Sequence, residues 1–334
     1  MERSITLAHG SGGRLTSDLI AEVFVATFAD HAGQAMDDAA VLPAGQGRVA
    51  LTTDSFVVKP RFFPGGDIGK LSICGTVNDL AVCGARPVAL TCAFIIEEGV
   101  AIDELTRIAA SMAACAAEAG VRLVAGDTKV VERGSGDGVY ITTAGYGLVA
   151  DGLQLSPASL APGDALLVSG DVGRHEAAIL LARGQISLAA PIVSDCGLLA
   201  ATAQAVLAAG GAGVRAMRDA TRGGLATVLC EWCETSGRAL LVEDAAVPVT
   251  APVQAVSELL GLDPLYLANE GRLVTAVAPD RADAVLAALQ ALDSSAACIG
   301  RVTDGARPRV LCETGVGGRR VLDKLAGGQL PRIC

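Results

Sequence analysis

Apolar residues along the chain repeat with two periods, one typical of helices and one typical of strands. Residues 15–30 show the helical period, with apolar side chains from Leu15 to Phe28 on one face. The predicted helices are 15–30, 68–84, 102–119 (ending at Gly120), one after Gly173, 197–208, 222–236, 251–260 and 280–292. The predicted strands are 39–42, 49–53, 88–96, 121–125, 139–149, 165–169, 239–242, 272–277 and 309–312.

The order of these elements predicts an α/β or α+β protein with two domains. Strands and helices mix in both halves, which favours layered sheets and helices over a helical bundle. Turn signals from Ser156 to Asp164 mark a domain boundary. We therefore expect an N-terminal domain over residues 1–155, a C-terminal domain over 156–325 and a mobile tail over 326–334.

Composition supports a large buried core and narrows the class of ligand. Of 334 residues, 51% are hydrophobic and 19% charged, which argues against disorder. The net charge is −10 and no basic stripe stands out, which argues against nucleic acid as the main ligand. We see no signal sequence and no run of about 18 apolar residues, so we expect a cytoplasmic protein without a membrane span.

Ten cysteines are present, and most lie in apolar stretches where a thiol behaves as a small hydrophobe. In the cytoplasm they are expected to stay reduced. Cys230 and Cys233 have the spacing of a metal or redox pair. No second pair or nearby histidine completes a tetrahedral site, which argues against that role.

Cys334 differs because it is the last residue of the chain. No downstream residue anchors its thiol, and nine extended residues would let it sweep on the order of 30 Å. This geometry suits a carrier arm, on which a small group is loaded at one place and altered at another. The alternative is an accidental surface cysteine on a frayed terminus.

A glycine-rich segment, His9–Arg14, precedes the first predicted helix. Such a loop offers successive N–H groups to an anion, and the helix N-terminus adds a favourable dipole. The segment lacks the ending of a P-loop and the spacing of a dinucleotide fingerprint, so a flexible turn is the alternative. Its candidate phosphate contacts are Gly10, Ser11, Gly12 and Gly13.

Several acidic residues stand at strand ends or turn starts, spread along the chain. Any one of them would ordinarily be a cap or turn residue. Mg²⁺, however, is commonly held by carboxylates together with substrate phosphates. A glycine-rich anion loop with dispersed aspartates predicts a phosphate–Mg²⁺ site without a P-loop. The candidates are Asp37–Asp38, Asp54, Asn78–Asp79, Asp127 and Asp219.

The triplet Asn269-Glu270-Gly271 precedes a predicted strand, and Lys129 lies in the first half. A glutamate in a turn flanked by apolar residues is a candidate general base with a raised pKa. A solvent-bound turn glutamate is the alternative.

Together these segments resemble the HypE family, a carbamoyl dehydratase of nickel–iron hydrogenase maturation within the PurM-like ATP-binding superfamily. The resemblance covers essentially the whole chain. Its most specific parts are Asp-Ala-Thr-Arg-Gly-Gly, Leu-Ala-Asn-Glu-Gly and the terminal Pro-Arg-Ile-Cys. The shared stretches are His9–Arg14, Met36–Val41, Thr52–Phe56, Gly75–Pro87, Gly126–Lys129, Met217–Leu225, Leu259–Leu273 and Gln329–Cys334.

The resemblance implies an N-terminal domain that dimerises through its sheet, and ATP bound between the sheet ends under the glycine-rich loop. Glu270 and Lys129 would lie at the reacting group, with Asn78, Asp219 and Asn269 near the nucleotide. The implied contacts to Mg²⁺ and phosphate are Asp38, Asp54, Asp79 and Asp127.

The implied reaction is ATP-dependent dehydration of an S-carbamoyl group on Cys334 to a thiocyanate, which supplies the cyanide ligand of the hydrogenase iron. The implied partners are a HypF-type carbamoyltransferase as donor and a HypC–HypD complex as acceptor. A selenophosphate synthetase is one alternative, although its reactive cysteine is expected near the glycine-rich loop, which has none. A non-catalytic scaffold with Cys334 as a metal or thiol ligand is the other.

Two stretches depart from what is common in the family. Glu176 follows His175 where a glycine commonly stands, and Gly315–Gly318 is also unusual. Both are expected to lie away from the ATP ligands and to affect local loop geometry.

Overall fold

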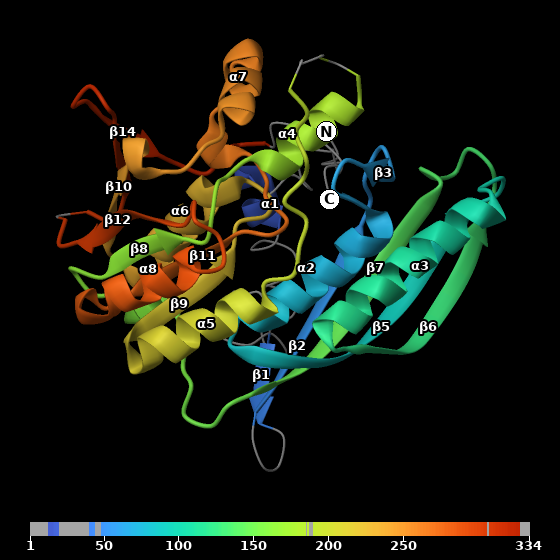
Figure 1. The fold of residues 1–334 in the computed structure, drawn as a ribbon, viewed down its shortest axis with the longest axis horizontal. Coiled ribbons are helices and arrows are strands. Elements are labelled where there is room, and N and C mark those ends of the chain that lie inside the picture. Colours follow the sequence, from blue (N-terminus) through green and yellow to red (C-terminus); the bar gives the residue numbers. More distant parts are fainter. Residues whose placement is uncertain are drawn as a thin grey trace.

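The computed structural model describes residues 13–19, 40–43, 48–184, 186, 190–305 and 307–327. The described chain forms two sheets with helices packed on their faces (Figure 1). This is the mixed α/β class that the order of elements predicts. Helix α1, Arg14–Leu19, is the described part of the helix expected over 15–30.

The first half contains a five-stranded sheet in the order β1-β2-β7-β5-β6. Strands β2, β7 and β5 pair antiparallel, whereas β5 and β6 pair parallel. Its strands are β1 Ala40–Pro43, β2 Arg48–Phe56, β5 Ala85–Glu97, β6 Arg122–Val131 and β7 Val139–Val149. A two-stranded ribbon, β3 Phe62–Phe63 with β4 Gly66–Asp67, precedes the first long helix.

Two helices, α2 (Ile68–Val82) and α3 (Ile102–Ala119), cover one face of this sheet (Figure 1). Asp67 caps the start of α2, since its carboxylate accepts from the N–H groups of Gly69 at 2.7 Å and Lys70 at 3.2 Å. Helix α3 ends where Gly120 adopts the left-handed conformation, as its sequence predicts.

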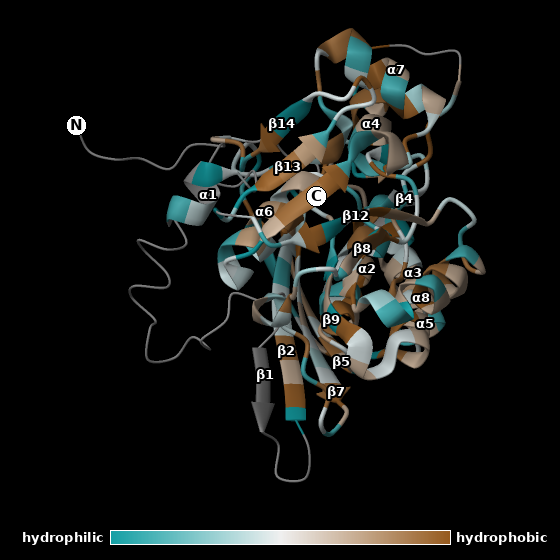
Figure 2. Ribbon diagram, turned by 90° about the vertical axis from the view of Figure 1, so that its left-hand side faces the viewer, coloured by the Kyte–Doolittle hydropathy of each residue, from teal (hydrophilic) through white to brown (hydrophobic). Residues whose placement is uncertain are grey.

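The other face of this sheet has no described helix on it. Side chains alternate along β7: every second one is buried against α2 and α3, and those between are half-buried or exposed. Leu51, Ile95 and Leu148 are large apolar residues on this open face, exposed by 43%, 42% and 38%. Figure 2 shows apolar stretches along strands of both sheets.

The second half contains a seven-stranded sheet in the order β14-β13-β10-β12-β8-β11-β9, in which only β10 and β13 pair parallel. Its strands are β8 Ala165–Val168, β9 Val214–Asp219, β10 Ala239–Glu243, β11 Leu273–Val277, β12 Ala297–Thr303, β13 Val310–Glu313 and β14 Arg319–Leu322.

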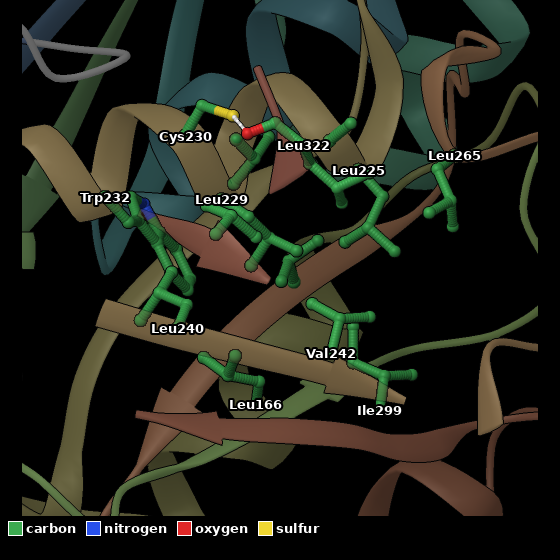
Figure 3. Close-up of a cluster of buried hydrophobic side chains, with 14 of the residues drawn as sticks. Leu166, Leu225, Leu229, Cys230, Trp232, Leu240, Val242, Leu265, Ile299 and Leu322 are labelled. Carbon is green, nitrogen blue, oxygen red and sulfur yellow. Dashed lines mark hydrogen bonds between the residues drawn. The ribbon is translucent and has the colours of Figure 1, made fainter. Parts of the chain in front are cut away.

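Helices cover both faces of this second sheet. Leu166 and Val168 of β8 pack against α6, and the alternate residues Ala165 and Leu167 pack against α5 and α8. The core under α6 is built around Trp232, which is fully buried (Figure 3). The helices are α4 Arg174–Ala182, α5 Ala200–Gly210, α6 Gly224–Ser236, α7 Ala251–Leu260 and α8 Ala282–Gln290.

Helix α2 connects the two halves. Thirteen of its residues are buried, because its outer side packs against α5 and β9 of the second half. Ala81 and Val82 belong to the same apolar cluster as Leu199 and Ala203. The apolar residues of α2 therefore lie on all sides, and its buried polar residues, such as Thr76 and Asn78, form hydrogen bonds.

Most predicted elements are present with shifts of a few residues at their ends. The sequence patterns missed β9, β12, β14 and the β3–β4 ribbon. These strands are short or interrupted by glycine and charged residues, so their pairing partners decide their conformation. Among the described helices, none is both long enough and apolar enough to cross a membrane.

Candidate active site

Two aspartates from the first half lie together between β2 and α2. Asp54 and Thr52 are two residues apart on β2, so both side chains point toward α2. Thr52 Oγ1 donates to Asp79 Oδ2 at 2.7 Å, and Thr76 Oγ1 donates to Asp54 Oδ2 at 3.3 Å. The structure thus brings together two of the predicted magnesium ligands.

Gly75 lets the helix approach the strand closely at this point. A Cβ atom at Gly75 would lie 2.8 Å from the ring of Phe56 and 3.7 Å from Asp54 Oδ2. A larger residue would therefore push α2, and Asp79 with it, away from β2.

The paired carboxyl groups have the chemistry of a hard-cation site. Burial raises the pKa of Asp54, although Arg222 and the side-chain hydrogen bonds with Asp79 and Thr76 oppose that shift. Two neighbouring carboxylates that share hydrogen bonds are oxygen donors of the kind that Mg²⁺ prefers. Within the described residues, no group of three potential metal ligands is complete. The predicted ligand Asp38 lies outside the described residues.

Glu270 lies in the turn before β11 and is 3% exposed. Burial raises the pKa of Glu270 well above its usual range. Four nearby groups raise it further, in decreasing order Cys196, Asp219, Asp195 and Asp54. Glu270 is therefore a buried acid rather than a solvent-bound turn residue. Its electrostatic neighbours come from both halves of the chain, since Asp54 is on β2 and Asp219 ends β9.

Asn269 and Asn78, which were predicted to lie near the nucleotide, form hydrogen bonds with the main chain through their side-chain amides. Asn269 Oδ1 accepts from Gly173 N at 2.7 Å, and its Nδ2 donates to the carbonyls of Ala220 at 2.8 Å and Leu267 at 3.0 Å. Asn78 makes similar bonds across the two halves. Both amides therefore shape the site in this structure by fixing the backbone around it.

Asp127 and Lys129 lie elsewhere within the protomer. They are on β6, three strands away from β2 and on the open face of the sheet, opposite Asp54 and α2. Their side chains are 65% and 72% exposed, and Lys129 Nζ lies 3.7 Å from Asp127 Oδ2. The structure does not bring either of them to Glu270 within one chain.

The glycine-rich loop and the C-terminal tail meet at their described ends. The N–H of Arg14, next to the candidate Gly13, donates to the carbonyl of Leu325. Tyr266, four residues before Glu270, donates its hydroxyl to the carbonyl of Asp323 at 2.9 Å. Five predicted site residues lie outside the described residues, namely Gly10, Ser11, Gly12, Asp38 and the terminal Cys334.

Sequence reasoning missed several residues of this site. Thr52 begins the shared stretch Thr52–Phe56, and Arg222 stands in Asp-Ala-Thr-Arg-Gly-Gly, so both belong to segments that the sequence had already indicated. Asp195 had no such signal, because the segment around it is neither helical nor a strand. Its side chain is fully buried and bonds to the main chain of Glu270 and Gly271.

The expectation that Glu176 lies away from the site was wrong. This residue is 2% exposed in the first turn of α4, and its Oε2 accepts from Ala268 N at 2.7 Å. Ala268 immediately precedes Asn269, so the departure from the family pattern falls on the turn that holds the site. Burial raises the pKa of Glu176 to about 7, although the hydrogen bond from Ala268 and the charge of Arg183 lower it.

The nine described cysteines are free thiols. Cys230 and Cys233 belong to the core under α6, where Cys230 Sγ donates to the carbonyl of Leu322 at 3.6 Å (Figure 3). Burial raises the pKa of Cys230 to about 12 and that of Cys233 to about 11. Both are packing residues with poor thiolate character.

Comparisons with known proteins agree with this arrangement. The N-terminal domain of AIR synthase related proteins matches residues 36–149, and the C-terminal domain of the same family matches 161–313. The carbamoyl dehydratase HypE of Rhodobacter capsulatus is 50% identical over 100% of this chain and 99% of its own length.

Two solved structures are similar over most of the chain. A chain from a HypE–HypF complex has a TM-score of 0.86 and 43% identity, covering 92% of this chain and 99% of its own. A HypE in complex with ATP has a TM-score of 0.83 and 44% identity, covering 99% of this chain and 100% of its own. The likeness therefore includes both sheets and the region between them.

Proposed function

Since the chain belongs to the HypE carbamoyl dehydratase family of hydrogenase maturation proteins, we propose that it uses ATP to convert an S-carbamoyl group on Cys334 into a thiocyanate. The main structural support is the buried acid Glu270 close to the carboxyl groups of Asp54 and Asp219. Identity of 50% to a carbamoyl dehydratase disfavours both the selenophosphate synthetase and the scaffold alternatives.

ATP and Mg²⁺ would bind beside the carboxyl groups of Asp54 and Asp79, whose oxygens suit a hard cation. Asp54 and Asp79 would hold the metal with Asp38 from the motif, and Mg²⁺ there would neutralise charge on the phosphates. Asp127 would have to come from a second copy of the chain, because within one chain it lies on the opposite face of the sheet. Asp219, Asn78 and Asn269 would border the nucleotide. The glycine-rich loop, Gly10 to Gly13, would close over its phosphates.

The reaction needs the carbamoyl oxygen to become a better leaving group. The carbamoyl oxygen of S–C(=O)NH₂ attacks the γ-phosphorus of ATP and ADP leaves. Release of one of the two N–H protons gives the imidate phosphate S–C(=NH)–OPO₃²⁻. A base then removes the remaining N–H proton while the C–O bond breaks, which gives S–C≡N and phosphate. We assign proton removal to Glu270. Lys129 would orient the carbamoyl group from a second copy of the chain, because within one chain it lies on the opposite face of the sheet from Asp54.

Two contacts at the base of the tail support a role for the tail in this reaction. Leu325 bonds to Arg14 beside the glycine-rich loop, and Asp323 bonds to Tyr266 just before Glu270. If residues 328–334 were extended, they would span about 25 Å. Cys334 would then reach both Glu270 and an outer surface where a donor protein can load it.

We base the proposed partners and oligomeric state on the family to which the chain belongs. We propose a HypF-type carbamoyltransferase as donor, a HypC–HypD complex as cyanide acceptor, and a cytoplasmic location. We also propose a homodimer formed through the open face of the first sheet, where Asp127 and Lys129 lie. The proposed domains are residues 1–155 and 156–325, with the tail over 326–334.

The test is the mass of the C-terminal peptide of purified protein that has been carbamoylated beforehand and freed of donor. With ATP and Mg²⁺ the peptide should lose the mass of one water, and without ATP it should keep the carbamoyl group. Release of one phosphate per thiocyanate should accompany the loss. Loss of water without ATP, or a tail that accepts no carbamoyl group from an active donor, would contradict the proposal.

The control is Cys334→Ala, which should bind ATP as tightly as the wild type and acquire no modification. Full modification of this variant would remove Cys334 from the reaction.

A further inference from the structure

The main chain at Glu270 is held on both sides by hydrogen bonds from other parts of the chain. The N–H groups of Glu270 and Gly271 both donate to Asp195 Oδ2, at 3.2 and 3.1 Å. The carbonyl of Glu270 accepts from Gly197 N at 3.2 Å and from Asn78 Nδ2 at 3.5 Å. The position of the Glu270 side chain is therefore set by these contacts.

The segment Ser194–Leu199, called the clasp below, is itself anchored to the first half. Ser194 N donates to the carbonyl of Pro64 at 2.9 Å. Asn78 of α2 donates to the carbonyl of Gly197 at 2.9 Å and accepts from Leu199 N at 2.7 Å. Because Asp79 follows Asn78, the clasp connects Glu270 to the helix turn that presents the metal-site aspartate.

Glu176 holds the same turn from the side of α4. Its Oε2 accepts from Ala268 N at 2.7 Å, and its own N–H donates to the carbonyl of Ala268 at 3.2 Å. Glu176 and Asp195 thus bond to the two ends of the segment 268–271.

Both carboxyl groups are expensive to bury. Asp195 has a fully buried side chain and Glu176 is 2% exposed. Asp195 Oδ1 and Glu176 Oε1 have no hydrogen-bond partner among the described residues. A buried carboxyl without full hydrogen bonding destabilises a fold, so apolar residues of similar size would suit packing better. An apolar residue would provide neither their bonds to segment 268–271 nor the ion pair between Asp195 Oδ2 and Arg272 Nε at 3.9 Å.

Gly271 makes the close contact with the clasp possible. A Cβ atom at this position would lie 2.0 Å from the carbonyl oxygen of Asp195. The turn and the clasp therefore fit together only with glycine at position 271.

We propose that Asp195 and Glu176 are positioning residues that fix segment 268–271, and with it the carboxyl of Glu270, at the reacting group; this rests on the proposed role of Glu270. Both residues act through their hydrogen bonds to the main chain of this segment. A displacement of about 1 Å at a catalytic group can cost about 100-fold in rate, so loss of either anchor should slow the chemical step.

Paired substitutions separate geometry from charge at each position. Asp195→Asn keeps an oxygen that accepts both N–H bonds, whereas Asp195→Glu keeps the charge and moves the oxygen by one methylene. Likewise, Glu176→Gln keeps the acceptor for Ala268, and Glu176→Asp withdraws it. The measurement is the rate of single-turnover conversion of carbamoylated Cys334 to thiocyanate at varied ATP concentration. It separates the maximal rate constant, called kcat below, from the ATP concentration that gives half of it, called KM for ATP.

The proposal expects Asp195→Glu and Glu176→Asp to lower kcat by about 10- to 100-fold with KM for ATP unchanged. The Asn and Gln variants should stay within about threefold of the wild type. Asp280→Asn, at a surface aspartate whose side chain is 75% exposed, is the control and should change nothing. Circular dichroism spectra of all variants should match.

A wild-type kcat in both Asp195→Glu and Glu176→Asp would overturn the proposal. An equal decrease of kcat in Asp195→Asn and Asp195→Glu would overturn it as well. Glu270→Gln, run in the same assay, tests the base itself. A normal rate in that variant would refute the assignment of Glu270, which is a different failure from that of its anchors.

Discussion

Glu270 combines a proton-accepting role with an environment that favours the protonated acid. Burial and the neighbouring Cys196 and Asp219 raise its pKa, and no described lysine lies beside it to lower that value. A base must lose its own proton before it accepts one from the substrate. The rate of dehydration should therefore depend on pH through this residue.

Glu270→Gln should leave carbamoylation of Cys334 intact and lower dehydration by at least about 100-fold, because the amide cannot accept the proton. Separate mass measurements of the carbamoyl and thiocyanate forms check both parts. Normal thiocyanate formation in this variant would assign the proton to another group.

In the wild type, dehydration should slow as pH falls, because Glu270 becomes protonated below its raised pKa. Asp219→Asn removes a neighbouring negative charge and should lower the pKa of Glu270. The pH below which the dehydration rate falls should therefore be lower in this variant than in the wild type. Single-turnover rates across the pH range check this shift. The same pH dependence of the rate in the variant and the wild type would show that Asp219 does not influence the pKa of Glu270.

Glu176 predicts a pH effect on stability. Its pKa is about 7 in the folded chain against 4.5 ordinarily, so between these values the folded state keeps a proton that the unfolded state loses. Stability from this residue is complete below pH 4.5 and is lost as pH rises through 7, by about 3 kcal/mol.

Glu176→Gln should therefore gain thermal stability relative to the wild type between about pH 5 and about pH 8. Unfolding midpoints of both proteins at the two pH values check the difference. Parallel pH dependence in both proteins would assign Glu176 an ordinary pKa.

At the scale of elements, two helices have different tasks. Helix α2 brings Asp79 to Asp54 and joins the halves, whereas α6 fills the core of the second sheet. Trp232 of α6 is fully buried among leucine and valine side chains from β8, β10 and β12 (Figure 3). This core extends to Ala220, which follows Asp219, and to Tyr266, four residues before Glu270.

Trp232→Ala should lower the free energy of unfolding by about 3–5 kcal/mol, because it removes a large buried ring and leaves a cavity. Chemical denaturation measures the loss. Leu259→Ala on α7 is the matched control: the side chain is 65% exposed, and the change should stay within about 0.5 kcal/mol. Equal effects of the two substitutions would contradict the described packing.

At the scale of the whole molecule, the open face of the first sheet stands out. An antiparallel sheet with one face on helices ordinarily presents polar side chains on the other, yet Leu51, Ile95 and Leu148 are exposed there. A second copy of the chain on this face would cover them and bring a second set of Asp127 and Lys129 side chains to the interface.

Ile95→Glu should therefore convert a dimer into a monomer, because a charge would be buried without a partner. Sedimentation equilibrium measures the change in mass. Leu259→Glu, at an exposed leucine on α7, is the control and should leave the mass unchanged. A dimer that survives Ile95→Glu would place the interface elsewhere.

The sequence by itself determined the family, the mixed α/β class and most element positions, because these depend on local periodicity, caps and short motifs. Helix α3 ends at Gly120 as its left-handed conformation requires, and Asp54 and Glu270 stand in motifs that can be read directly. The roles of Asp38, Cys334 and the glycine loop remain predictions, since these residues lie outside the described ranges.

Only the tertiary structure decided which of the candidate residues meet. Asp127 and Asp54 lie in similar strand-end motifs, yet strand order and pleat put them on opposite faces of one sheet. Asp195 gave no readable signal and Glu176 stood out only as a departure from the family pattern, because a carboxyl that bonds to a distant backbone has no periodicity in sequence. Contacts over long sequence separation come from packing of the two halves, which no local pattern specifies.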